Sequence, residues 1–212
     1  MAYYYLIAQL PYLIYGQDAP MSSVQFKSLC ESELSPRDAA LLELCTLDPE
    51  PEAVRTEGGE GVSYRDVPIT TVSPFINGWR IWERALRLNL ARYRAQHLGQ
   101  EGSVDPPEEP MEAGALAKTA LGLDSPLEAE LFLDQARWNA IEALQGFDYF
   151  GVTTIYAYLL RLLLMERRSL FRPEEGFTAY KGLYTAIMAA ASGLESGGGS
   201  KSEISIESGE PK

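Results

Sequence analysis

The residues that could do chemistry in this chain are few. Its single histidine, His97, falls at the end of the longest expected helix, where the helix dipole favours a charged imidazole and a structural role. With one histidine, a Ser-His or Cys-His pair has only one possible base, and the HExxH sequence of zinc proteases is absent. We therefore expect no catalytic residue.

Carboxylates, thiols and glycines do not form a metal or cofactor site in the sequence either. Glu130 and Asp134 lie four residues apart, as in carboxylate-bridged bundles, but no ExxH sequence accompanies them. Cys30 and Cys45 lack a third and fourth zinc ligand, are too far apart along a helical hairpin for a disulfide, and fit a reducing compartment. The TEGGEG segment at 56–61 lacks the Gly-Lys-Ser/Thr of a phosphate-binding loop. We expect no metal and no cofactor.

Composition narrows the class of protein. The 212 residues are 46% hydrophobic and 10% aromatic, which is typical of a globular chain with one good core. A net charge of −12 argues against nucleic-acid binding, because phosphates attract basic surfaces. The N-terminal MAYYYLIAQLPYLIYG lacks a basic region and is interrupted by Pro11, so we expect a cytoplasmic protein without a signal peptide.

The chain is organised around residues 125–171, which are predicted to form two helices joined at Gly146. Ser125, Pro126 and Glu128 form a helix-start signal with a capping box. The first helix has two apolar faces and should lie between neighbours. The second, from about Val152 to Arg168, is apolar nearly all round and should lie at the centre of a bundle.

Arg161 decides between a core helix and a membrane span. A span needs about 20 apolar residues, and an arginine at its middle costs roughly 2.5 to 3.5 kcal/mol. We therefore predict a helix of a water-soluble bundle, with no direct membrane insertion. A buried arginine needs an acceptor, and Asp134 on the preceding helix is the predicted partner.

The remaining elements are also expected to be helices. Gly99 ends the longest of them, and acidic, Gly- and Pro-rich loops are expected at 48–68 and 100–112. The sequence therefore predicts an all-α bundle of about six or seven helices in one domain, residues 1–192, followed by a disordered tail, 193–212. The expected elements are a short buried segment at 3–10, for which helix is preferred to strand, and helices at 22–32, 35–45, 73–98, 111–121 and 174–192.

A stripe of arginines runs beside the apolar face of the 73–98 helix in this otherwise acidic chain. It is either a face that pairs with acidic loops of the same chain or a docking surface for an acidic partner. Contact with a membrane surface or a nucleic acid is less favoured, because the net charge is repulsive. The predicted partner-binding residues are Arg80, Arg84, Arg87 and Arg94, with Arg167 and Arg168 as a second basic spot at a helix end.

Three stretches carry a resemblance to a known family: YYYLIAQLP, SPRDAALLEL and LFLDQARWNAIEALQGFDYFGVTTIYAYLLRLLLMERRSLF. Together they resemble an uncharacterised bacterial family that is usually encoded among the subunits of V-type (vacuolar/archaeal-type) ATP synthase operons, and the likeness spans most of residues 1–190. FGVTTIYAYLLRLLLMERRSLF is also similar to a segment of the all-helical, funnel-shaped V-type ATPase component that seats the central stalk on the rotor ring.

The resemblance implies a noncatalytic accessory, linker or assembly subunit of a V-type ATPase. Such a protein would be cytoplasmic, peripherally associated with a membrane complex, and would act through contacts with other ATPase subunits. Two alternatives stay open: a small helical enzyme or ligand-binding protein with a pocket between the 73–98 helix and the 125–168 helix pair, and a membrane-surface adaptor. The oligomeric state is left open.

Overall fold

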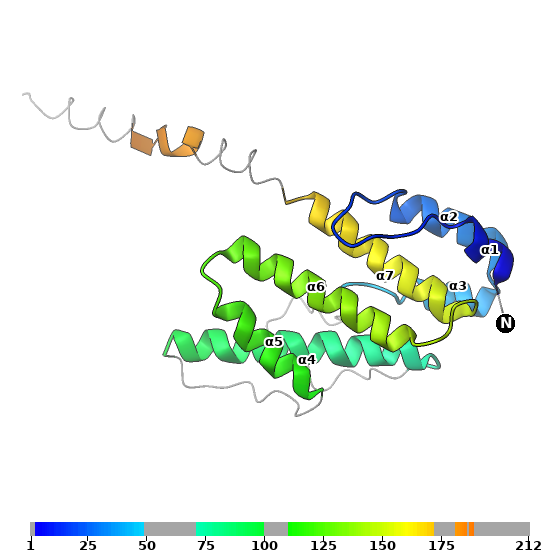
Figure 1. Ribbon diagram of the computed structural model, residues 1–212, viewed down its shortest axis with the longest axis horizontal. Coiled ribbons are helices and arrows are strands. Elements are labelled where there is room, and N and C mark those ends of the chain that lie inside the picture. The colour runs from blue at the N-terminus through cyan, green and yellow to red at the C-terminus, as the bar shows by residue number, and fades with distance from the viewer. Residues whose placement is uncertain (1–2, 49–70, 100–109, 172–180, 186, 189–212) are drawn as a thin grey trace, which may run out of the picture. The chain divides into compact units, whose positions relative to one another are not determined.

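A computed structural model describes residues 3–48, 71–99, 110–171, 181–185 and 187–188. The chain divides into two units, 1–170 and 171–212. All regular elements among the described residues are helices (Figure 1), which confirms the all-α prediction. The predicted tail, the domain boundary at 192, nearly all of both acidic loops and most of the predicted 174–192 helix lie outside the described residues.

Three short helices open the first unit: α1 (Tyr4–Gln9), α2 (Ser23–Glu33) and α3 (Pro36–Leu42). Serine caps begin the second and third, because Ser22 forms a capping box with Gln25 and the Ser35 hydroxyl accepts from a backbone N–H at 3.2 Å. The expectation that residues 3–10 form a buried element is only partly right. Leu6 is buried, whereas Tyr4 and Tyr5 are exposed.

The longest helix, α4 (Pro74–His97), packs against α5 (Met111–Leu121). Ser73 caps α4, and Gly99 follows its end at φ +65°, as the sequence predicts. Ile81 does not extend the apolar face inward and is exposed at the rim of a pocket. The predicted apolar face is confirmed in its other members: Phe75, Trp79, Trp82, Leu86, Leu88 and Leu90 are buried, and Tyr93 packs partly buried against the core.

The central pair is α6 (Pro126–Gln145) and α7 (Val152–Ser169). Helix α6 contacts α4, α5 and α7, while α7 contacts α2, α3 and α6, so the pair joins the short N-terminal helices to the α4–α5 group (Figure 1). Ile155, Tyr156, Leu159, Leu160 and Leu162 of α7 are fully buried, as expected of a central helix. Among the described residues, none of the helices combines the length and apolar character that crossing a membrane requires.

The turn between α6 and α7 is built by its own side chains. Gly146 adopts φ +58°, as the predicted joint requires of a residue without a side chain. The carboxylate of Asp148 accepts the Gly151 N–H at 2.7 Å, and its backbone carbonyl accepts from the Thr154 hydroxyl. The Phe150 carbonyl in turn accepts the N–H of Tyr3 at 2.7 Å. The turn is therefore held against the start of α1.

Candidate functional site

The arginine stripe on α4 is less accessible than the sequence suggests. Arg84 is buried, so its predicted role on an open docking face is not supported by its exposure. Arg80 is half-buried and donates to the Leu44 carbonyl at 3.4 Å. Arg94 is exposed near the end of the helix. Contact with a partner stays a prediction for this stripe, and Arg94 is its most accessible member.

Arg87 pairs within its own chain. Its Nε donates to Glu83 Oε1 at 2.9 Å, its Nη1 lies 3.3 Å from Asp48 Oδ1, and its Nη2 donates to the Leu47 carbonyl at 2.9 Å. Two roles were open for the arginine stripe. The contacts of Arg87 agree with pairing within the same chain.

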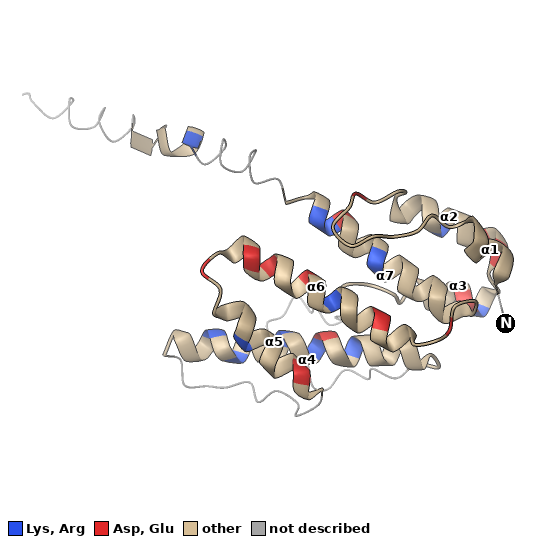
Figure 2. Cartoon of the chain, viewed as in Figure 1, with Lys and Arg blue, Asp and Glu red and all other residues tan. Residues whose placement is uncertain are grey.

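A buried charge network joins α4, α6 and α7. Glu83, which is fully buried, accepts two bonds from Arg137, from Nε at 2.9 Å and from Nη2 at 3.1 Å. Arg137 Nη1 also lies 3.2 Å from Asp134 Oδ1, and the same oxygen accepts from Arg167. Figure 2 shows that acidic and basic residues both occur on α4 and α6, and that basic residues occur on α7. The network joins acidic Glu83 of α4 to basic Arg137 of α6, and acidic Asp134 of α6 to basic Arg167 of α7. Forked guanidinium-carboxylate contacts of this kind are among the strongest polar contacts in proteins.

The predicted Asp134–Arg161 pair is wrong, because each side chain has other partners. Asp134 bonds to Arg137 and Arg167, whereas Arg161 Nη2 donates to Gln145 Oε1 at 2.9 Å. Arg167 stands six residues beyond Arg161, or about 9 Å along α7, so the two helices pair in a different register from the one assumed. Sequence reasoning missed Glu83 and Arg137. Both could have been recognised as Asp134 was, because each is a charged residue among the apolar residues of a helix face that points inward.

The second predicted basic spot, at the end of α7, divides between two roles. Arg167 belongs to the buried network, and burial lowers its pKa while Glu83 and Glu130 act in the opposite direction. Arg168 is half-buried, with its guanidinium 5.1 Å from the ring centre of Tyr15. Cation–π packing thus accounts for its position without a partner.

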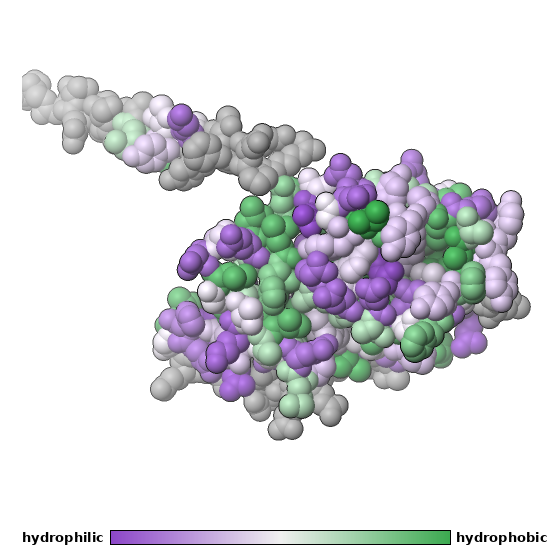
Figure 3. All heavy atoms as spheres, viewed as in Figure 1, coloured by the Kyte–Doolittle hydropathy of each residue, from purple (hydrophilic) through white to green (hydrophobic). Residues whose placement is uncertain are grey.

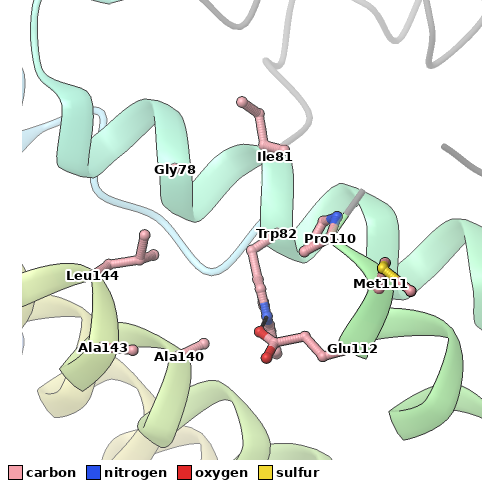
Figure 4. A pocket seen from close by; sticks show the side chains of 9 residues that line it. All are labelled: Gly78, Ile81, Trp82, Pro110, Met111, Glu112, Ala140, Ala143 and Leu144. Atoms are coloured by element: carbon pink, nitrogen blue, oxygen red, sulfur yellow. Dashed lines mark hydrogen bonds between the residues drawn. The ribbon is translucent and has the colours of Figure 1, made fainter. Parts of the chain in front are cut away.

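A first pocket of about 530 Å³ lies where the sequence predicted one, between α4, α6 and the start of α5 (Figure 4). Small residues, among them Gly78 and Ala140, leave the space open. Glu112 provides a carboxylate, and one of its oxygens already accepts the Trp82 indole N–H at 2.7 Å. Because the rest of the lining is apolar, the described residues bring no converging set of polar groups to this pocket that could act on a substrate.

A second pocket, of about 410 Å³, lies at the end of the bundle where α6 turns into α7. Its walls come from α6, α7, the turn between them, α1 and the segment that follows α1. Arg161, Glu142, Gln145 and Thr154 bring polar groups together there. The aromatic walls are Tyr12, Trp138, Tyr149 and Tyr158, and the remaining lining residues are Ile7, Leu10, Pro11, Leu13 and Gly146.

Arg161, which the sequence analysis paired with Asp134, lines this second pocket instead. Its guanidinium carbon lies 5.4 Å from the ring centre of Trp138, and its Nε is buried with no hydrogen-bond partner among the described residues. Burial lowers the pKa of Arg161, while Glu142 and Tyr12 act in the opposite direction. The Tyr158 hydroxyl donates to the Pro11 carbonyl at 3.0 Å, and burial raises its pKa to about 12.

Exposed aromatic side chains surround this end of the bundle. Phe147 is 92% exposed and Tyr12 is 87% exposed, and the ring of Tyr4 packs 4.9 Å from that of Phe150. Figure 3 shows hydrophobic side chains interspersed with hydrophilic ones on the face in view. We call the following set the aromatic surface: Tyr4, Tyr5, Tyr12, Phe147, Tyr149 and Phe150.

The described residues contain no group of three or more His, Cys, Asp or Glu side chains that could hold a metal ion. Cys30 and Cys45 are free and buried, so the prediction that they do not form a disulfide is confirmed. No protein-family model, curated protein or solved structure matches this chain.

Proposed function

We propose that the protein is a noncatalytic adaptor that binds a partner protein through the aromatic surface. The observation that carries this proposal is the exposure of six aromatic side chains on α1, the segment after it and the α6–α7 turn. Tyrosine and phenylalanine are enriched in the centres of protein interfaces, because they bury a large apolar area at low entropic cost. Solvent exposure of such a cluster in a free chain is typical of a surface that a partner covers.

The turn that carries half of this surface is suited to binding. Asp148 bonds to the Gly151 N–H and, through its own carbonyl, to Thr154, while the Phe150 carbonyl accepts from Tyr3. These bonds hold the turn in one conformation before a partner arrives. Pre-organisation lowers the entropic cost of association, so affinity can come from few contacts.

The proposed partner is a V-type ATPase, in which the chain acts as an accessory, linker or assembly subunit. The resemblance of its N-terminal, 35–44 and 131–171 segments to a family encoded with V-type ATP synthase subunits supports this part of the proposal. Its place is then cytoplasmic and peripheral to the membrane complex. A helical bundle that transmits force or holds position needs no active site of its own, since nucleotide chemistry stays on the catalytic subunits.

The experiment is co-purification of tagged full-length chain from its native cells. We expect V-type ATPase subunits in the eluate of the unmodified chain, and a large loss of them with Tyr5→Ala combined with Phe147→Ala. Truncation of central interface residues costs about 2 kcal/mol or more, which is roughly a thirtyfold loss of affinity. The control is Val24→Ala combined with Leu98→Ala, which truncates two apolar side chains that are also largely exposed, at 75% and 73%, but lie outside the aromatic surface.

The outcomes separate the two parts of the proposal. Retention of the subunits by the aromatic double variant would show that the interface lies elsewhere. Arg94→Glu then tests the remaining accessible member of the arginine stripe, whereas reversing Arg84 and Arg87 would place charges beside the buried Glu83 and disturb the fold. Co-purification of other proteins, without ATPase subunits, would reject the V-type ATPase as the partner.

A second candidate function, ligand binding, is favoured by the second pocket, which we call the Arg161 pocket. Its volume falls within the range of small-molecule sites, and it combines aromatic walls with several converging polar groups. A ligand-binding role therefore fits this pocket better than the apolar one between α4 and α6, where the sequence placed it.

A further inference from the structure

Arg161 carries more hydrogen-bonding capacity than the structure uses. A guanidinium has five N–H donors, and within the described residues this one makes a single hydrogen bond, to the neutral amide of Gln145. No ion pair joins Arg161 to a described carboxylate. By contrast, Arg137 on α6 and Arg167 on α7, the two arginines of the buried network on these helices, each have one. A partly buried cation that makes no direct ion pair is costly, and an anion that entered the pocket would reduce that cost.

We propose that this pocket binds a carboxylate that is attached to an apolar or aromatic body. A carboxylate matches the fork of a guanidinium with two parallel hydrogen bonds. Among the described residues, Arg161 donates only through Nη2, to Gln145, so its Nη1 donors are left for a ligand. The body of the ligand packs between Trp138 and the tyrosine walls. The inference does not depend on the V-type ATPase, because it concerns the chemistry of the pocket alone.

The carboxylate of Glu142 repels an anionic ligand, so replacing it predicts the direction in which anion affinity changes. It also lines the pocket, and its charge raises the pKa of Arg161, so it already attracts the guanidinium from the exposed side. An incoming carboxylate competes with Glu142 and is repelled by it. Removal of the Glu142 charge therefore increases affinity for an anion, whereas removal of the Arg161 charge decreases it.

The carboxylate can come from a small molecule or from an acidic side chain of a polypeptide. The pocket opens beside the aromatic surface, since Tyr12 and Tyr149 belong to both. A peptide would keep one acidic side chain in the pocket while its neighbours contact the surrounding aromatic residues. A free acid would be held by the pocket alone.

The test is a titration of the full-length chain followed by the indole N–H signals in ¹H–¹⁵N spectra. Trp138 is one of three tryptophans and lies against Arg161, and a Trp138→Phe spectrum identifies its signal. The probes are 3-phenylpropionate, its neutral analogue 3-phenylpropanamide, and the peptide acetyl-Phe-Glu-Phe-amide. We expect the Trp138 signal to shift saturably with the acid and the peptide, and affinity for the neutral amide to be about tenfold to a hundredfold lower.

The variants decide the outcome. Arg161→Gln lowers affinity for both carboxylates by about tenfold or more, Glu142→Gln raises it, and Arg168→Gln, which removes an arginine stacked on Tyr15 outside the pocket, leaves it unchanged. Tighter binding of the peptide assigns the site to a polypeptide partner, and tighter binding of the free acid assigns it to a small molecule. Equal binding of acid and neutral amide, no saturable shift with any probe, or a fall in affinity with Glu142→Gln would overturn the proposal.

Discussion

Two arginines on neighbouring helices, Arg137 and Arg161, are held in opposite ways. Arg137 is buried and makes three hydrogen bonds to two carboxylates, those of Glu83 and Asp134. Arg161 is half-buried, bonds to the neutral Gln145, and leans over an aromatic ring at the edge of a pocket. Burial alone therefore does not assign a role to a charge. Arg137, which is paired with carboxylates, holds helices together, whereas Arg161, which makes no direct ion pair with a described carboxylate, is the one available to a ligand.

Replacing Arg137 tests the structural side of this contrast and has the largest expected effect. Arg137→Met leaves the carboxylates of Glu83 and Asp134 buried with fewer partners. Removing one member of a buried ion pair costs about 3 to 5 kcal/mol of unfolding free energy. Urea unfolding at neutral pH, followed by circular dichroism, measures this loss. A loss below about 1 kcal/mol would mean that the network adds little to stability.

Gly146→Ala tests how the turn positions the Arg161 pocket. Gly146 has φ +58° and ψ −132°, a conformation that strains any residue with a Cβ, so we expect a loss of about 1 to 3 kcal/mol. Gly122→Ala is the matched control, because Gly122 also follows a helix but has φ −85°. Thermal or urea unfolding of both variants gives the difference. Equal stabilities would show that the turn can adopt another backbone path.

Replacing Arg161 tests the binding side of the contrast. Arg161→Met removes a half-buried charge that has no carboxylate partner among the described residues, so we expect a change in unfolding free energy below about 1 kcal/mol, of either sign. Measured beside Arg137→Met in the same urea titration, the difference between the two variants is the informative quantity. A loss as large as that of Arg137→Met would make Arg161 a structural residue.

Alkaline pH tests how the buried thiol and phenol groups contribute to stability. Burial raises the pKa of Cys30 from 9.0 to about 12 and that of Tyr158 from 10.0 to about 12. A pKa that is raised on folding means that the native state holds the proton more tightly, so stability is fully present below pH 9 and falls as the pH rises toward 12. The unfolding free energy should therefore be lower above about pH 10 than at about pH 8.

Variants assign that decline to its groups. Cys30→Ala and Tyr158→Phe each remove one titrating group, so the loss between pH 8 and about pH 10 should become smaller in both, by an amount that stays within about 1.4 kcal/mol per group and pH unit. An undiminished decline in both variants would place its origin in other residues.

Local signals in the sequence account for the helices. Ser22, Ser35, Ser73 and Ser125 each precede a helix that their side chains cap, and Gly146 marks the joint of the central pair. These features depend on neighbours within one turn of chain, so they can be predicted without a fold. The burial of α7 is also predictable, because its apolar residues cover nearly all of its circumference.

The candidate site could not be predicted in the same way. The aromatic surface needs α1 and the α6–α7 turn, nearly 150 residues apart, to meet through the Tyr3–Phe150 bond. Tyrosines at 3–5 are apolar enough to be assigned to the core, and only the packing of Leu6 beside them leaves Tyr4 and Tyr5 outside. The exposure of a side chain on a short helix depends on which side the neighbouring elements cover. The apolar pattern of the six-residue helix α1 is too short to specify that side.

The order of residues along the chain is enough to predict that it is all-helical, where most of its helices begin and end, and that a leucine-rich helix lies at its centre, since these follow from capping, glycine conformations and apolar periodicity. Which charges meet is a property of the packed helices alone. Asp134 finds Arg167 instead of Arg161 because partner choice depends on the register between two helices, and a shift of less than two turns changes every contact across their interface. That same shift leaves Arg161 at a pocket, with an amide in place of a carboxylate.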